Sequence, residues 1–117
     1  MANRERGTVT IAAGGKDYLL QFTTNAMCEL EDATGKSITA VVAELSDEAN
    51  PPGMKLLRTV LWAGLTEHHA GIDIKDAGAI CDDIGMDKLG GVIGDALQAA
   101  FPEQDGKSGK AKASKAG

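Results

Sequence analysis

Two adjacent histidines beside a glutamate, Glu67, His68 and His69, are the residues of this chain that most directly suggest metal chemistry. Imidazole and carboxylate groups bind zinc, and zinc proteases place two histidines four residues apart on one helix face. Adjacent residues of a helix point about 100° apart, so His68 and His69 cannot easily face one ion. No third ligand lies at a suitable spacing. The sequence therefore predicts a solvated helix end and no metal site.

The aspartates around Gly85 are a second group of candidate ligands. Asp82, Asp83 and Asp87 flank this glycine, but the Asp-x-Asp/Asn-x-Asp/Asn-Gly order of a calcium loop is missing. Cys28 has no histidine at a fixed spacing that could activate it as a nucleophile. We therefore expect no catalytic residue, no metal site and no cofactor, and a protein that is not an enzyme.

Three glycines near the end of the sequence, Gly90, Gly91 and Gly94, do not form a phosphate-binding loop. No strand is expected before them, and the Gly-Lys-Ser/Thr ending of such a loop is absent. Glycine lowers helix stability. The one-turn spacing of Gly90 and Gly94 therefore predicts a close backbone approach between this helix and a neighbouring helix.

The elements that position these residues follow from hydrophobic periodicity. Residues 8–22 alternate apolar and polar side chains around Gly14 and Gly15, which predicts a β-hairpin. A lone hairpin is marginal in water, so we expect an α+β fold in which an N-terminal hairpin packs on a small bundle of about five helices. The expected helices run from an N-cap at Thr24 or Asn25 to Gly35, over 38–46 after Ser37, over 54–67 with an end near His68–Gly71, from Asp73 to Gly85, and over 87–101.

The expected core is aliphatic, because the chain has only four aromatic side chains. Cys81 is placed in this core and Cys28 on an outer face, so both are expected as free thiols. Met54 and Leu56 fall on the apolar half of the helix over 54–67. The first helix is expected to turn Ala26, Met27, Leu30 and Ala33 inward. The predicted buried residues are Val9, Ile11, Leu20, Leu30, Val41, Leu45, Leu57, Leu61, Ile80, Ile84, Leu89, Ile93 and Leu97.

Trp62 lies outside the apolar arc of the helix over 54–67, beside Arg58. Two interpretations stay open. Trp62 closes the rim of the core with Arg58 over its face, or the pair anchors a partner protein, as tryptophan and arginine often do. Glu29, Glu31 and Asp32 offer a similar choice between an acidic contact surface and a solvated helix face.

Composition and charge limit the partners of this chain. It has 117 residues with a formal charge of −5, of which residues 103–117 carry +2 and the part before them −7. An acidic body argues against nucleic acid as a partner. No segment has the roughly 20 apolar residues that cross a bilayer, and no apolar run suggests a signal peptide. We expect a cytoplasmic protein with a flexible N-terminus over 1–6, one domain over 7–102, and a disordered lysine-rich tail over 103–117.

Three stretches resemble a known family: YLLQFTTNAMCELEDATG (18–35), LRTVLWAGLTEHH (57–69) and ALQAAFP (96–102). They are similar to the gp10-like tail proteins of gene transfer agents and related tailed bacteriophages. Members of this family are described either as tail tube proteins or as tail assembly chaperones. A tube subunit implies a β-sandwich or barrel, whereas this sequence predicts one hairpin and many helices.

The resemblance therefore implies a non-enzymatic tail assembly chaperone in the host bacterial cytoplasm. Its partners would be the tape-measure protein and the tail tube protein, with no nucleic acid and no membrane. The proposed contacts are Trp62, Arg58, Glu29, Glu31 and Asp32. The alternative is a structural tail tube protein, and the sequence leaves homo-oligomer formation open.

Overall fold

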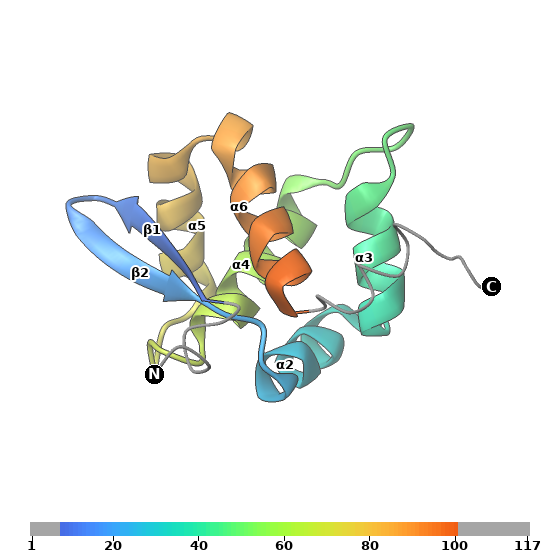
Figure 1. The fold of residues 1–117 in the computed structure, drawn as a ribbon, viewed down its shortest axis with the longest axis horizontal. Coiled ribbons are helices and arrows are strands. Elements are labelled where there is room, and N and C mark those ends of the chain that lie inside the picture. Colours follow the sequence, from blue (N-terminus) through green and yellow to red (C-terminus); the bar gives the residue numbers. More distant parts are fainter. Residues whose placement is uncertain (1–7, 101–117) are drawn as a thin grey trace.

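The computed structural model describes residues 8–100, an antiparallel β-hairpin followed by five helices (Figure 1). The predicted α+β fold is therefore confirmed. The expectations for residues 1–6, for Phe101 and for 103–117 lie outside the described residues. The elements are β1 (Val9–Ala13), β2 (Lys16–Leu20), α2 (Thr24–Thr34), α3 (Ile38–Ser46), α4 (Met54–Leu65), α5 (Ile74–Ile84) and α6 (Met86–Ala100).

The hairpin turns at Gly14 and Gly15, as predicted. Ala13 pairs with Lys16, so these two glycines alone form the loop, and both have positive φ values, 59° and 79°. Two consecutive residues with positive φ give the turn whose twist matches a β-hairpin, and glycine adopts that conformation without strain. The apolar face of the hairpin contacts α4, α5 and α6, and it buries Ile11, Ala13 and Leu20.

Helix α4 is the centre of the domain. It packs against α2, α5, α6 and β2, and its residues Leu57, Val60, Leu61 and Leu65 are buried. Gly64 allows β2 to lie close, because a Cβ at this position would lie 2.9 Å from Phe22 Cζ and closer still to Leu20. The backbone N–H of Gln21 donates to the carbonyl of Gly64 across this contact, at 2.9 Å. Close packing here therefore requires glycine.

Helices α2 and α4 differ from the prediction at two boundaries and in the exposure of one side chain. Thr23, rather than Thr24 or Asn25, is the N-cap of α2, and its Oγ1 accepts from Ala26 N at 3.1 Å. Helix α4 ends at Leu65, and residues 66–71 form turns. Met54 is 49% exposed because the first turn of α4 projects beyond the core.

The other caps follow the prediction. Gly35 ends α2 in the left-handed conformation with φ 71°, and the Ser37 side chain accepts from Ala40 N at the start of α3. Asp73 caps α5 in a reciprocal capping box with Asp76. These interactions use backbone N–H groups that helix ends leave without a partner inside the helix.

The core is aliphatic, as expected. Leu30, Val41, Ile80, Leu89, Ile93 and Leu97 are buried with the hairpin and α4 residues, whereas Val9, Leu45 and Ile84 are half-buried against the core. Ala33 is exposed, contrary to the prediction, and Met27 is half-buried. No helix within residues 8–100 has the length and apolar character needed to span a membrane.

Candidate partner-binding groove

The histidine pair lies against the hairpin and holds it to the end of α4. The backbone N–H of Leu19 donates to Nε2 of His69 at 2.9 Å, and Nε2 of His68 lies 2.8 Å from Oε1 of Gln21. His69 is half-buried, and its ring lies 5.2 Å from the ring of Tyr18 at a tilt of 57°. The prediction of a solvated helix end is therefore wrong for His69, although His68 is exposed.

Glu67 joins the turn after α4 to the N-cap of α2. Its carboxylate accepts a hydrogen bond from the Thr23 hydroxyl at 2.9 Å. Burial, followed by the neighbouring charges of His68 and Lys16, lowers the pKa of His69. Within residues 8–100, no group of three His, Cys, Asp or Glu side chains is arranged to hold a metal ion.

The two cysteines lie where the sequence placed them. Cys28 is exposed on α2 and Cys81 is buried on α5, and both are free thiols. Burial, and secondarily the charge of Asp82, raises the pKa of Cys81, while the charge of Arg58 opposes the change. A raised pKa keeps Cys81 in the unreactive thiol form.

Trp62 packs against the rim of the core. Its ring is half-buried, and its Nε1–H donates to the carbonyl of Ile72 at 3.1 Å. This geometry favours the rim interpretation, because the polar atom of the ring is used inside the domain. The Arg58 stem lies near α5, where a Cβ on Gly78 would be 3.3 Å from Arg58 Cδ. Arg58 Nε is buried without a hydrogen-bond partner among the described residues.

The three acidic residues of α2 have different surroundings. Glu31 Oε2 accepts a hydrogen bond from the backbone N–H of Ile38 at 2.7 Å, so this carboxylate joins α2 to the start of α3. Glu29 and Asp32 are exposed. The structure therefore gives Glu31 a local role in positioning α3 and leaves Glu29 and Asp32 on the surface.

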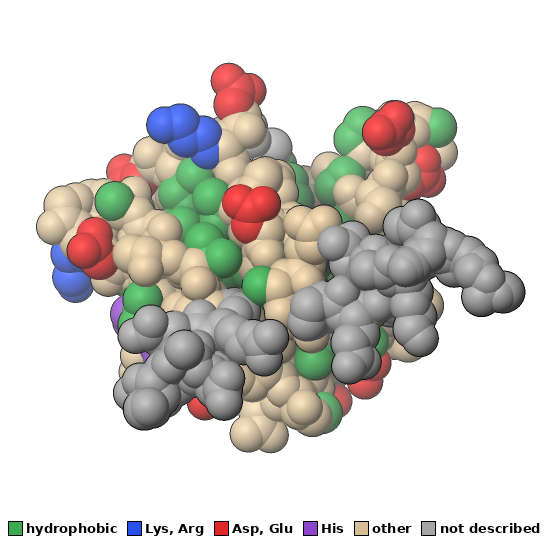
Figure 2. Space-filling view, in the orientation of Figure 1, with side chains coloured by type: hydrophobic (Ala, Val, Ile, Leu, Met, Phe, Trp, Pro, Cys, Tyr) green, Lys and Arg blue, Asp and Glu red, His purple; other side chains and the backbone are tan. Residues whose placement is uncertain are grey.

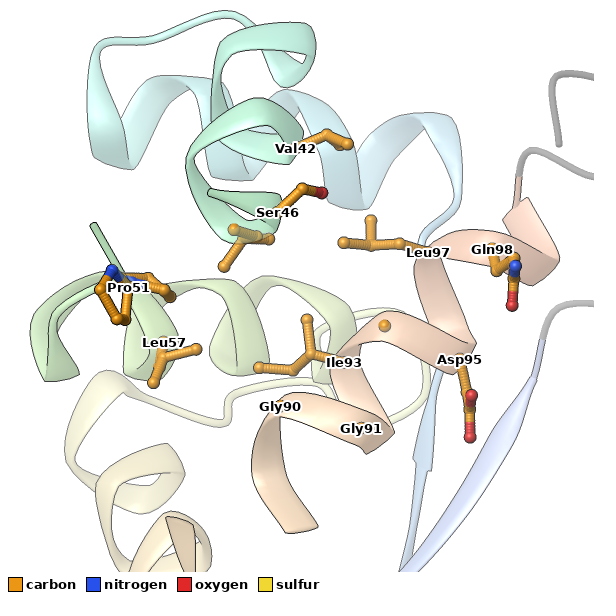
Figure 3. A pocket seen from close by; sticks show the side chains of 13 residues that line it. Val42, Ser46, Pro51, Leu57, Gly90, Gly91, Ile93, Asp95, Leu97 and Gln98 are labelled. Carbon is orange, nitrogen blue, oxygen red and sulfur yellow. The ribbon is translucent and has the colours of Figure 1, made fainter. Parts of the chain in front are cut away.

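An apolar groove lies between α3, the residues before α4, and α6 (Figure 3). It is open to the surface and has a volume of about 750 Å³. The backbone of α3 lies against α2 and makes at most a minor contact with α4 or α6. The side chains of Val42 and Leu45 are therefore only half-buried. The groove is lined by Val42, Leu45, Ser46, Pro51, Pro52, Leu57, Gly90, Gly91, Ile93, Gly94, Asp95, Leu97 and Gln98.

The three glycines of α6 border this groove. Gly90, Gly91 and Gly94 are exposed, and a Cβ added to any of them would have no neighbouring atom within 4 Å. The predicted close approach to a neighbouring helix is therefore wrong, because no other helix of residues 8–100 lies against these positions. Glycines spaced along a helix make room for a close neighbour, but their spacing does not show whether a neighbour is present.

The groove lining carries a negative charge at Asp95. Asp95 is the charged side chain among the lining residues, and the C-terminal end of α3 reaches the groove at Ser46. The last turn of α3 has no basic residue to offset the negative end of its dipole, and Asp47 and Glu48 follow. Residues 8–100 as a whole contain six Lys and Arg against fourteen Asp and Glu, a net −8.

No pattern in the sequence predicts this groove. Its two walls come from residues about fifty positions apart, and no local pattern pairs them. The feature of the sequence that relates to the groove is the apolar character of the short helix α3. In the structure, Val41 is the one residue of α3 that is fully buried. An apolar helix with one fully buried residue leaves an apolar face available for a binding partner.

Comparison with known proteins gives no family assignment. The chain matches no family model, no curated protein and no solved structure. The groove and the sequence resemblance are therefore the features that bear on its function.

Proposed function

We propose that this chain is a non-enzymatic tail assembly chaperone of a phage-like particle. It would act in the bacterial cytoplasm and bind the tape-measure protein and tail tube subunits while the tail is assembled. The observation that carries the proposal is the open apolar groove between α3 and α6. The resemblance of residues 18–35, 57–69 and 96–102 to tail proteins of gene transfer agents supports it.

A groove of this kind suits a protein that binds and later releases its partners. Interfaces that bury little area are typical of transient contacts, whereas permanent subunits bury larger and more apolar surfaces. About 750 Å³ of apolar groove offers room for a few side chains rather than for a whole domain face. An assembly factor absent from the finished particle needs this kind of limited and reversible contact.

The alternative function is a structural tail tube protein. A tube subunit is expected to form rings through extended sheets. The sheet of the described residues has two strands, β1 and β2, and the remaining elements are helices. This composition favours the chaperone over the tube subunit.

Quantitative mass spectrometry of particles and of the producing cells tests the proposal. We expect a tagged copy of the chain to co-purify with the tape-measure protein from cells that are assembling tails. We expect the chain to be missing from purified particles, and its deletion to abolish tails. Its presence in purified particles in the same amount as a ring subunit would contradict the chaperone function and support the tube protein.

A further inference from the structure

We propose that the groove between α3 and α6 binds one amphipathic helix of a partner protein, with its apolar stripe flanked by lysine or arginine. This inference rests on the proposed function, since the helix would belong to the tape-measure protein. It adds the site and the chemistry of the bound segment. It also moves the main contact away from Trp62, whose indole N–H is bonded inside the domain.

The shape of the groove is the first argument. Val42 lies on the α3 side of the groove, and Leu97 of α6 lies across from it (Figure 3). Leu45 of α3 also lines the groove. Leu57 and Ile93 also line the groove and are themselves buried. An apolar groove between two helices accepts the i, i+3, i+4 and i+7 side chains of a third helix.

The glycines of α6 are the second argument. Gly90, Gly91 and Gly94 lower the stability of their own helix relative to alanine, and no residue within 8–100 packs on them. The space above these three positions lets another backbone approach α6 closely. A bound helix uses that space, and no contact inside the described residues does.

Charge is the third argument, and it selects a basic helix. Asp95 lies on the lining, and Asp47 and Glu48 follow the uncompensated end of α3. Figure 2 shows acidic side chains on α6 and at the α3–α4 connection, on either side of this region. Complementary charge fixes orientation and raises the association rate. An acidic helix would be repelled.

Two other occupants fit less well. A second copy of the domain carries the same net −8 over residues 8–100, so two copies repel each other. Residues 101–117 of the chain itself carry a net +2, but Phe101 is their one large apolar side chain, too few to supply an i, i+3, i+4 and i+7 stripe. A separate helix that is both apolar and basic satisfies both requirements.

Binding of a synthetic peptide to the full chain tests the inference. The probe is a fluorescein-labelled peptide of about 18 residues, or five helical turns, with leucines at the i, i+3, i+4 and i+7 positions and lysines elsewhere. Fluorescence anisotropy at 0.15 M salt should show saturable binding. A peptide of the same composition with scrambled leucines, and one with glutamate in place of lysine, should each bind at least tenfold more weakly. Equal binding of the scrambled peptide would overturn the proposal.

Filling the groove gives the sharpest variant. Gly94→Leu places a side chain in the open space of the groove, so it should weaken the affinity for the peptide at least tenfold. It should not lower the melting temperature, because no described atom lies within 4 Å of a Cβ at this position. Ala43→Leu is the matched control, because Ala43 is exposed on α3 and does not line the groove. If the folded Gly94→Leu protein binds the probe like wild type, the groove is not the site.

Charge reversal separates specific from general attraction. Asp95→Lys should weaken binding of the lysine peptide severalfold and strengthen binding of the glutamate peptide. Glu29→Lys changes the net charge equally on exposed α2, outside the groove lining, and should have a much smaller effect. If the two variants change peptide affinity equally, the peptide is attracted by the net negative charge of the domain and not by the groove, and the inference is overturned.

The peptide assay and the particle experiment fail independently. Probe binding that Gly94→Leu abolishes, in a protein found stoichiometrically in particles, would leave the groove assignment standing and refute the chaperone function. If the Gly94→Leu protein still co-purifies with the tape-measure protein, the groove assignment is refuted. The chaperone function would stand, and the contact would lie elsewhere on the domain.

Discussion

The backbone N–H of Leu19 donates a hydrogen bond to Nε2 of His69, fifty residues further along the chain, at 2.9 Å. To accept this bond, Nε2 must be unprotonated, which places the ring proton on Nδ1. Protonation of His69 would therefore replace an acceptor by a second donor facing an N–H group. The contact that holds β2 to the end of α4 thus depends on the charge of one imidazole.

The stability of the domain should depend on pH through His69. Burial, then the charges of His68 and Lys16, lowers its pKa from the ordinary value of 6.5. As pH falls below about 6.5, the unfolded chain takes up the proton before the folded one does, so the free energy of unfolding decreases. The decrease ends once the pH passes below the lowered pKa of the folded state. Urea unfolding between pH 7.5 and 5 measures it.

Two single variants serve as controls for this pH dependence. His69→Gln removes the titrating ring and should flatten the change in unfolding free energy over this pH range. His68→Gln retains His69 and should keep most of the slope, because burial is the larger cause of the pKa shift. A wild-type slope in the His69→Gln protein would show that other groups cause the pH dependence.

Glycine-to-alanine substitutions in α4 and α6 should have opposite effects. At Gly64 a Cβ would collide with Leu20 and Phe22, so Gly64→Ala should destabilise the domain by about 1–3 kcal/mol. At Gly94 the space is open, so Gly94→Ala should stabilise it by about 0.5–1 kcal/mol through helix propensity. Thermal and urea unfolding measure both. A stabilising Gly64→Ala would mean that β2 does not lie close to α4 in solution.

The contrast between these glycines shows how far the sequence could predict the fold. Turn and cap residues act over a few positions, so the Gly14–Gly15 turn and the Ser37 and Asp73 caps were predictable. Gly64 and Gly94 have the same local sequence signal, a glycine inside a helix, yet one is enclosed and the other open. Only the packing of distant elements decides between the two environments.

The candidate site was less predictable for the same reason. The bond from Leu19 to His69 and the two walls of the groove both join residues about fifty positions apart. The N-cap of α2 shows a smaller ambiguity, because Thr23, Thr24 and Asn25 are consecutive residues that can all cap a helix. The structure selects Thr23, whose side chain accepts from Ala26 N, and Ala26 and Leu30 of the same helix are buried.

Substitutions of Trp62 should separate its role in the core rim from a role as a partner anchor. Trp62→Phe removes the bond to the Ile72 carbonyl and should cost about 0.5–1.5 kcal/mol. Trp62→Ala also removes the packing of the half-buried ring and should cost roughly 2–4 kcal/mol, somewhat less than for a fully buried ring. Urea unfolding measures both. An unchanged stability of Trp62→Ala, with loss of co-purified tape-measure protein, would instead establish Trp62 as an anchor.

Loss of the Glu31 carboxylate should affect both the stability of the domain and the shape of the groove. Glu31 Oε2 accepts from the N–H of Ile38, at the start of the helix that forms one wall of the groove. Glu31→Ala should therefore cost about 1 kcal/mol, similar to the loss of a helix cap. The remaining link nearby, the ion pair of Lys36 with Glu44 at 2.6 Å, is exposed and contributes little.

Because α3 is then held less firmly against α2, Glu31→Ala should also weaken binding of the leucine–lysine peptide. Glu29→Ala is the matched control, since Glu29 is exposed on the same helix and no hydrogen bond or ion pair is recorded for it among the described residues. It should change neither the unfolding free energy nor peptide binding by more than a small amount. If Glu31→Ala destabilises the domain but leaves peptide affinity unchanged, the position of α3 does not determine the shape of the binding site. If both variants weaken the peptide equally, the carboxylates of α2 act through charge alone, and the acidic face of α2 becomes the contact surface.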